Sequence, residues 1–195
     1  MRSIRTVAGA AAAVAAWLVA TPASADPATA NSIQLGVGFR YGFAASDVEV
    51  VTPAGDQGKL NLWGIGLGLN GGYTLPNAVY VGGNLEYFFG DQVGDNTDGG
   101  SGNIWQITAE GGYDIGLGPI FVLRPKLGAG LANLHVKGCA GGQCTDSSDS
   151  KFALLPGATF ILMPPGFRLS ADLRYEFVLA DQGPKAVILA VGIGF

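Results

Sequence analysis

The chain has 195 residues, a length suited to one domain and short for two. Hydrophobic residues make up 48% of it and charged residues only 13%, against roughly 25% charged in an ordinary soluble domain. The formal net charge of −4 argues against a nucleic acid as partner, because binding to phosphates needs an excess of lysine and arginine.

The N-terminus predicts a cleaved export signal that is no part of the fold. Arg2 and Arg5 precede an uninterrupted apolar run over 7–20, and the small residues Ala23-Ser24-Ala25 form a cleavage site. A membrane anchor is the alternative, but a run of about 14 apolar residues is too short to span a bilayer as a helix. A lipoprotein is not expected, since no cysteine follows the run. The predicted organisation is a signal peptide over 1–25, a short periplasmic segment over 26–31 and one domain over 32–195.

Eight later segments alternate bulky apolar residues with small or polar ones, the pattern of strands with one hydrophobic face. In the first of them, alternate residues from Ile33 to Phe43 are apolar, and Gly36, Gly38 and Arg40 lie between them. The segments cover about 32–44, 60–73, 78–90, 104–115, 120–137, 151–163, 167–179 and 186–195. Tight turns at 74–77, 116–119 and 164–166 alternate with longer polar loops at about 45–59, 91–103, 138–150 and 180–185.

The last segment, AVILAVGIGF, has an apolar residue at every second position and finishes on Phe195. A strand of this kind must pair along both edges or become a site of aggregation. In a closed barrel it pairs with the strand before it and with the first strand. The sequence therefore predicts an all-β, eight-stranded, antiparallel up-and-down barrel.

The apolar face of this barrel is predicted to point outward. A soluble eight-stranded barrel of the lipocalin type, the competing fold, puts its apolar side chains inside. The interior of eight strands is only just wide enough for side chains, so the bulky rows cannot fit there and the glycine-rich rows can. A bulky apolar outer face requires lipid around it. Aromatic residues near both strand ends are then expected to form girdles at the membrane boundaries, among them Trp63, Tyr73, Trp105, Tyr113, Phe167 and Phe177.

From about Ser32 to Phe195 the chain resembles the small outer-membrane barrels of the OmpA membrane domain and OmpX kind. The resemblance rests on the alternating strands, the unequal connections and the C-terminal Phe195, which in such barrels is an assembly signal read by the outer-membrane assembly machinery. It implies a Gram-negative outer membrane, contact with lipid and lipopolysaccharide, and a porin-like, non-enzymatic protein that acts structurally or through its four outward loops. We do not expect the peptidoglycan-binding domain of full-length OmpA-type proteins. We expect a monomer.

Charged residues recur on the predicted lumen side, five of each sign. In a confined lumen they must be paired or hydrated, so a salt-bridge plug is expected; the resemblance offers a narrow, gated path for ions or small solutes as the alternative. The network comprises Arg40, Glu86, Glu110, Asp114, Arg124, Lys126, Arg168, Asp172, Arg174 and Glu176. Glycines such as Gly66 are frequent on the predicted lumen side of the last strand and the first two. This predicts that one half of the barrel wall has few inward side chains and packs against the bulky inward side chains of the other half.

Other chemistry has weaker support. Cys139 and Cys144 predict a local disulfide, because an exported protein meets an oxidising compartment; a metal site with His135 is the alternative. A surface adhesin or a lipid-active barrel is a further alternative, although His135 lacks the His–Ser motif of lipid A deacylases. The oxygen-rich stretch 91–103 does not match a calcium loop. No catalytic residue, metal or cofactor is predicted.

Overall fold

The computed structural model describes residues 27–45, 48–51, 57–60, 62–94, 99–140, 143–180 and 183–195. The predicted signal peptide over 1–25 and its cleavage site lie outside the described residues, as do parts of the four predicted polar loops. The described residues include no helix that is long and apolar enough to cross a membrane.

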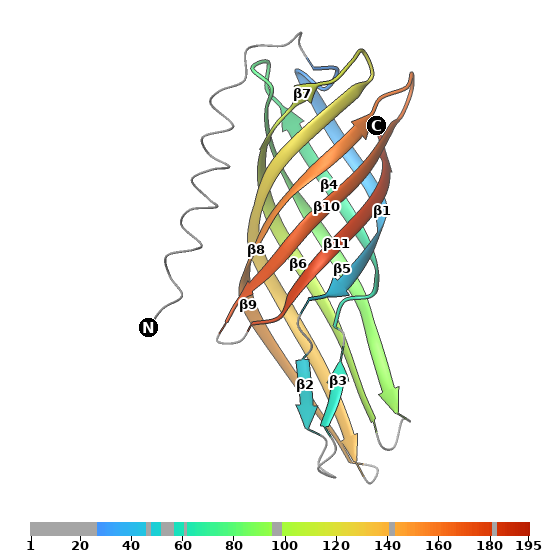
Figure 1. Ribbon diagram of the computed structural model, residues 1–195, viewed down its shortest axis with the longest axis vertical. Helices are drawn as coiled ribbons and strands as arrows, with labels where there is room; N and C mark the ends of the chain where they lie inside the picture. Colours follow the sequence, from blue (N-terminus) through green and yellow to red (C-terminus); the bar gives the residue numbers. More distant parts are fainter. Residues whose placement is uncertain are drawn as a thin grey trace.

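The described strands form a closed antiparallel barrel of eight strands, as the sequence predicts (Figure 1). Its wall runs in the order β6-β5-β4-β1-β11-β10-β9-β8, and the pairing of β6 with β8 closes it. The eight are β1 (Ser32–Ala44), β4 (Ile65–Thr74), β5 (Val79–Gly94), β6 (Gly99–Tyr113), β8 (Phe121–Ala140), β9 (Gln143–Leu162), β10 (Arg168–Leu179) and β11 (Lys185–Gly194). Two shorter strands, β2 (Val48–Val51) and β3 (Gln57–Leu60), pair only with each other, and β7 (Ile115–Gly116) pairs with β8.

The C-terminal strand β11 is paired along both edges. Its register with β1 runs from Gly36 opposite Gly194 to Ala44 opposite Ala186. On its other edge it pairs with β10, from Arg168 opposite Gly194 onwards. Phe195 extends this closure, because its backbone N–H and carbonyl both bond to the backbone of Leu35, at 3.0 and 3.1 Å.

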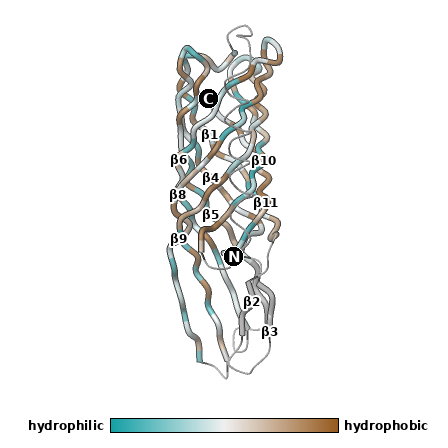
Figure 2. Tube along the Cα trace, turned by 60° about the vertical axis from the view of Figure 1, so that its left-hand side comes forward, coloured by the Kyte–Doolittle hydropathy of each residue, from teal (hydrophilic) through white to brown (hydrophobic). Residues whose placement is uncertain are grey.

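Hydrophobic side chains cover the outside of the barrel, as the alternation predicts. On β1, the large side chains at alternate positions from Ile33 to Phe43 are exposed, whereas Gln34 and Arg40 are buried. On β9 the inward positions include Ala153, Leu155 and Ile161, so the interior also holds apolar side chains. Figure 2 shows the apolar residues along the barrel wall and hydrophilic ones along the strands that project beyond it. An outer surface with exposed apolar rows of this kind is typical of barrels that are surrounded by lipid.

The two ends of the barrel differ. Connections at 75–78, 117–120 and 163–167 are short, and we call this the short-turn end; the C-terminus lies there (Figure 1). At the opposite, long-hairpin end, β5, β6, β8 and β9 continue beyond the wall. The prediction of polar loops at 91–103 and 138–150 was therefore wrong: β5 reaches Gly94, β6 starts at Gly99, and β8 and β9 run to Ala140 and from Gln143. Backbone pairing continues there without the apolar alternation on which the prediction depends.

Two smaller differences concern strand ends. Part of the predicted loop at 45–59 is the β2–β3 hairpin, in which Val48 lies opposite Leu60. The predicted strand 104–115 is interrupted at Asp114, a buried residue between β6 and β7. The Asp114 backbone N–H bonds to Ala78 O at 2.9 Å, and its carboxylate is held inside the barrel by several donors, which are described below.

Candidate functional site: the barrel interior

Glu86, on β5, is the centre of the charged interior. Its carboxylate is buried and accepts hydrogen bonds from Arg40 Nε at 2.6 Å, from Arg174 Nη2 at 2.5 Å and from Arg174 Nη1 at 3.1 Å. Gln106 Nε2 adds a fourth donor at 2.6 Å. One carboxylate thus joins two arginines from β1 and β10, both of which are almost fully buried.

A second part of the network surrounds Lys126, on β8. Its ammonium contacts Glu110 Oε1 at 2.9 Å and Asp172 Oδ1 at 3.1 Å. Asp172 also forms an ion pair with Arg174, whose Nε lies 2.6 Å from Asp172 Oδ2, and it accepts a hydrogen bond from Thr159 Oγ1 at 2.7 Å. Because Arg174 contacts both Glu86 and Asp172, the two parts form one continuous ion-pair network across five strands.

A third group fills the short-turn end. Asp114 accepts from Arg124 Nε at 2.5 Å and Nη2 at 2.8 Å, from Thr74 Oγ1 at 2.9 Å and from the Thr29 hydroxyl. Arg124 also lies over the Tyr80 ring, 3.6 Å from its centroid. Thr29 belongs to a turn over 27–31, inside the segment predicted to be periplasmic, in which Ala30 N donates to Pro27 O at 2.8 Å. This turn places a buried side chain against the interior of the barrel at that end.

Gln34 connects this group to Arg168. Its Oε1 accepts from Arg168 Nη1 at 2.6 Å and from Arg124 Nη2 at 2.9 Å, and its Nε2 donates to Thr74 Oγ1 at 2.8 Å. Gln34, Thr74, Gln106 and Thr159 are absent from the site predicted from the sequence. Strand parity could have placed Gln34 and Gln106 inside, but it could not show that they bridge charged groups.

The long-hairpin end of the interior is apolar. Leu62, Trp63, Phe88, Ile104 and Leu155 are fully buried and belong to one cluster. The cluster is completed by Ala132, Ala153, Val178, Ala186 and Ile188. Glu176 lies fully buried at this end, and its Oε2 accepts from Trp63 Nε1 at 3.1 Å. The ten predicted charges therefore separate into six ion-paired residues around Glu86 and Lys126, three at the short-turn end, and Glu176.

The prediction that Trp63 belongs to a lipid-facing girdle was wrong. Its side chain is fully buried, and β4 begins only at Ile65. Gly64, between them, has φ 118°, a left-handed conformation that breaks the alternation and that glycine adopts without strain. Gly42 on β1 faces Trp63, and a side chain there would collide with the indole.

The other proposed girdle residues do lie on the outer face. Trp105, Phe167 and Phe177 are exposed by 42%, 40% and 36%, and Phe195 by 82%. Tyr73 and Tyr113 are partly exposed, and the Tyr73 hydroxyl donates to Asn31 Oδ1 at 2.5 Å. These rings lie near strand ends, so they can meet the boundary between hydrocarbon and headgroups.

Inward glycines match the largest interior side chains. A Cβ atom on Gly66 would lie 2.8 Å from the Phe88 ring, and one on Gly68 would lie 2.9 Å from the Arg40 guanidinium. Gly72 and Gly82 face the Tyr80 ring in the same way, and Gly157 faces Arg174. Because glycine has no side chain at these positions, the ion-pair network and the apolar cluster have room inside the barrel.

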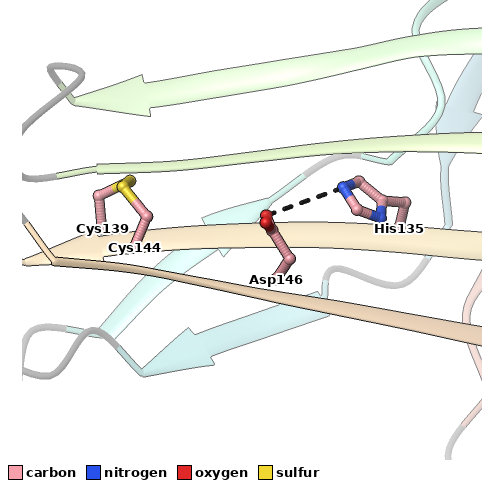
Figure 3. Close-up of a disulfide and its surroundings, with 4 residues drawn as sticks. All are labelled: His135, Cys139, Cys144 and Asp146. Carbon is pink, nitrogen blue, oxygen red and sulfur yellow. Dashed lines mark ion pairs between the residues drawn. A yellow bond between two sulfur atoms is a disulfide. The ribbon is translucent and has the colours of Figure 1, made fainter.

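The projecting β8–β9 hairpin carries the two cysteines. Figure 3 shows Cys139 and Cys144 joined by a disulfide across the two strands, with His135 and Asp146 beside it. His135 Nε2 lies 3.9 Å from Asp146 Oδ1, and both side chains are substantially exposed. Since the sulfurs are bonded to each other, they are not available for the alternative metal site with His135. The described residues contain no group of three metal-binding side chains.

The sequence profile of the outer membrane protein beta-barrel domain matches residues 10–195. The chain belongs to this family. No curated protein sequence matches it. Among solved structures it is similar to Ail, the attachment invasion locus protein of Yersinia pestis, with a TM-score of 0.56, 18% identity and coverage of 84% of this chain and 97% of Ail.

Two further structures share the fold. A major outer membrane protein of Thermus thermophilus gives a TM-score of 0.56 at 14% identity, covering 84% of this chain and 99% of that one. Neisserial surface protein A gives 0.52 at 16% identity, covering 83% and 95%. This member of the outer membrane beta-barrel family thus shares the fold of these small barrels.

Proposed function

We propose that this protein is a non-enzymatic surface protein of a Gram-negative outer membrane, which binds extended segments of other polypeptides through the free edge of β9. The observation that carries the proposal is the unequal pairing of this strand. With β8 it pairs as far as Ala140 opposite Gln143, but its pairing with β10 ends at Phe152 opposite Leu179. Among the described residues, the edge over 143–151 has no neighbour on that side.

The backbone groups of this edge can be assigned from the register. The Cα atoms of Cys139 and Cys144 are 4.0 Å apart, a spacing typical of pairs that do not exchange backbone hydrogen bonds. The register continues unbroken along the hairpin, so Asp146, Ser148 and Ser150 share this type of pair with β8. Their N–H and C=O groups therefore point toward the free edge, where an added strand would bond to them.

The side chains along this edge indicate a hydrophilic partner. Residues 143–150 are all exposed, and they include Thr145, Ser147, Ser148 and Ser150 but no aliphatic or aromatic residue. Asp146 and Asp149 disfavour a sulfated polyanion. A related solved structure shows Ail with the heparin analogue sucrose octasulfate. The acidic residues of this edge lead us to propose a polar or basic peptide segment here.

The test uses Ser148, whose backbone N–H points to the free edge. Proline at this position removes that donor and leaves the backbone bonds to β8 intact, so Ser148→Pro is expected to abolish binding of an extended peptide of alternating threonine and lysine. Ser148→Ala keeps the N–H and is expected to bind like the parent protein. Binding is measured by fluorescence anisotropy of the labelled peptide, with the protein in detergent micelles.

Amide hydrogen exchange locates the peptide. Binding should slow exchange at Asp146, Ser148 and Ser150 and leave Ser147 and Asp149, which already bond to β8, unchanged. Equal binding by Ser148→Pro and the parent protein would contradict the proposal, as would protection confined to another strand.

We further propose that the lumen does not conduct. The apolar cluster at the long-hairpin end contains fully buried Trp63, Phe88 and Leu155, and an ion crossing it would have to lose its hydration among these apolar side chains. Protein reconstituted into a planar lipid bilayer is expected to give no discrete openings. Regular openings by the parent protein would favour the narrow-channel alternative.

The proposed setting is a monomer embedded in outer-membrane lipid, with the long-hairpin end outward. Exposed apolar rows around the whole wall support contact with acyl chains and with lipopolysaccharide. Export through the predicted signal peptide and recognition of Phe195 by the assembly machinery complete the proposal. Phe195 is suited to that role because its ring is the most exposed large hydrophobic side chain of the described residues.

A further inference from the structure

A small cavity lies among the charged side chains of the lumen. It has a volume of about 30 Å³ and is lined by four cationic side chains, those of Arg40, Arg124, Lys126 and Arg168. Glu110 and Asp172 also line it. The space suits one or two water-sized particles and excludes an organic ligand.

The cations differ in how they are neutralised. Arg40 is paired with Glu86, Arg124 with Asp114, and Lys126 with both Glu110 and Asp172. Arg168 is 5% exposed, and its hydrogen bond goes to the neutral Gln34. Within the described part of the chain, no carboxylate lies within ion-pair distance of Arg168.

The two carboxylates that line the cavity do not neutralise Arg168, because both are paired with other cations. Glu110 is bound to Lys126, and Asp172 is bound to Lys126 and to Arg174 Nε. Among the residues that the structure describes, this part of the lumen holds five cationic side chains and only four carboxylates. The cations are those of Arg40, Arg124, Lys126, Arg168 and Arg174, and the carboxylates are those of Glu86, Glu110, Asp114 and Asp172. The fifth carboxylate, Glu176, is held by Trp63 at the long-hairpin end. This part of the lumen therefore carries one excess positive charge, located on Arg168.

An isolated buried charge is costly, and a bound counterion reduces that cost. Two glycines give the guanidinium room beside the cavity, since a Cβ atom on Gly36 or Gly194 would lie only 3.2 or 2.8 Å from Arg168 Nη2, while Arg168 itself lines the cavity. Only one of the five N–H groups of Arg168 is used by Gln34, so others can donate into the cavity. We infer that the lumen cavity beside Arg168 binds one small monovalent anion, of the size of chloride.

The primary test replaces Arg168 by glutamine. The folded parent protein in detergent is expected to melt at a higher temperature in sodium chloride than in sodium gluconate of equal ionic strength, because gluconate is too large for the cavity. Arg168→Gln is expected to lose this difference between the two salts. Lys137→Gln, which removes a positive charge from the exposed hairpin, serves as the matched control and should keep the difference.

Bromide diffraction tests the site without any substitution. Crystals of the parent protein soaked in sodium bromide are expected to show an anomalous peak within hydrogen-bonding distance of the Arg168 guanidinium. A chloride effect of equal size in Arg168→Gln, or crystals without a peak at this position, would overturn the inference. Should Arg168→Gln not fold, the diffraction result alone decides.

Discussion

Replacing Glu86 by alanine is expected to lower the free energy of unfolding by about 3–5 kcal/mol, the cost of leaving buried charges without a partner. Glu86 is the carboxylate that holds both Arg40 and Arg174, and it makes four hydrogen bonds inside the barrel. Its loss leaves Arg40 without a carboxylate in the described network. The measurement is a urea titration of the barrel in lipid vesicles, read by the shift in gel migration between folded and unfolded protein.

Asp149→Asn is the matched control for this experiment. Asp149 forms an ion pair with Lys151 at 2.7 Å, but its side chain is 62% exposed. Exposed pairs contribute less than about 1 kcal/mol, so this variant should unfold close to the parent protein. Combining Glu86→Ala with Arg40→Met removes one orphaned cation and should recover part of the loss. Equal stability of Glu86→Ala and Asp149→Asn would show that the buried network does not hold the fold.

Gly66→Leu is expected to destabilise the barrel by about 3 kcal/mol or to prevent folding, because it overfills the interior. A Cβ atom at this position would lie 2.7 Å from the Tyr87 carbonyl oxygen and 2.8 Å from the Phe88 ring. Neither can withdraw, since Tyr87 belongs to the backbone ladder with β4 and Phe88 is fully buried. The fraction of protein with the faster, folded gel migration measures the effect.

The same substitution on the lipid-facing side provides the control. Gly111 on β6 is exposed, and a Cβ there would meet nothing within 4 Å, so Gly111→Leu should fold like the parent protein. Phe88→Ala added to Gly66→Leu should restore folding in part by freeing the space of the ring. Normal folding of Gly66→Leu would refute the complementarity of glycine and large side chains across the lumen.

Strand parity explains how much of the fold could be predicted from the sequence. A period of two assigns each residue to a face, and for this reason it correctly predicts Arg40, Glu86 and Arg174 inside and the apolar residues of β1 outside. The same rule holds on β9, where Phe152 faces outward and Ala153 inward. It fails at Trp63 because the residue precedes β4, and the left-handed Gly64 ends the regular alternation there.

The partners of the interior charges could not be obtained in the same way. Parity gives the face of a residue but not its height in the barrel, which depends on register and strand tilt. Five charges of each sign suggest complete pairing, yet Glu176 lies at one end with Trp63 and Arg168 bonds to a neutral amide at the other. Similarly, the projecting hairpins carry no apolar alternation, so composition alone could not distinguish them from loops.

The pairing of β11 with β1 bears on the order of events during synthesis. These two strands lie at opposite ends of the barrel sequence, and each needs the other to cover its edge. Contacts between distant segments form late, because the entropy of the intervening chain must be lost first. A ribosome releasing β1 therefore releases a strand whose partner does not yet exist, and the barrel cannot close before β11 has been synthesised. Until β11 arrives, the exposed edge of β1 must be kept from pairing with other chains.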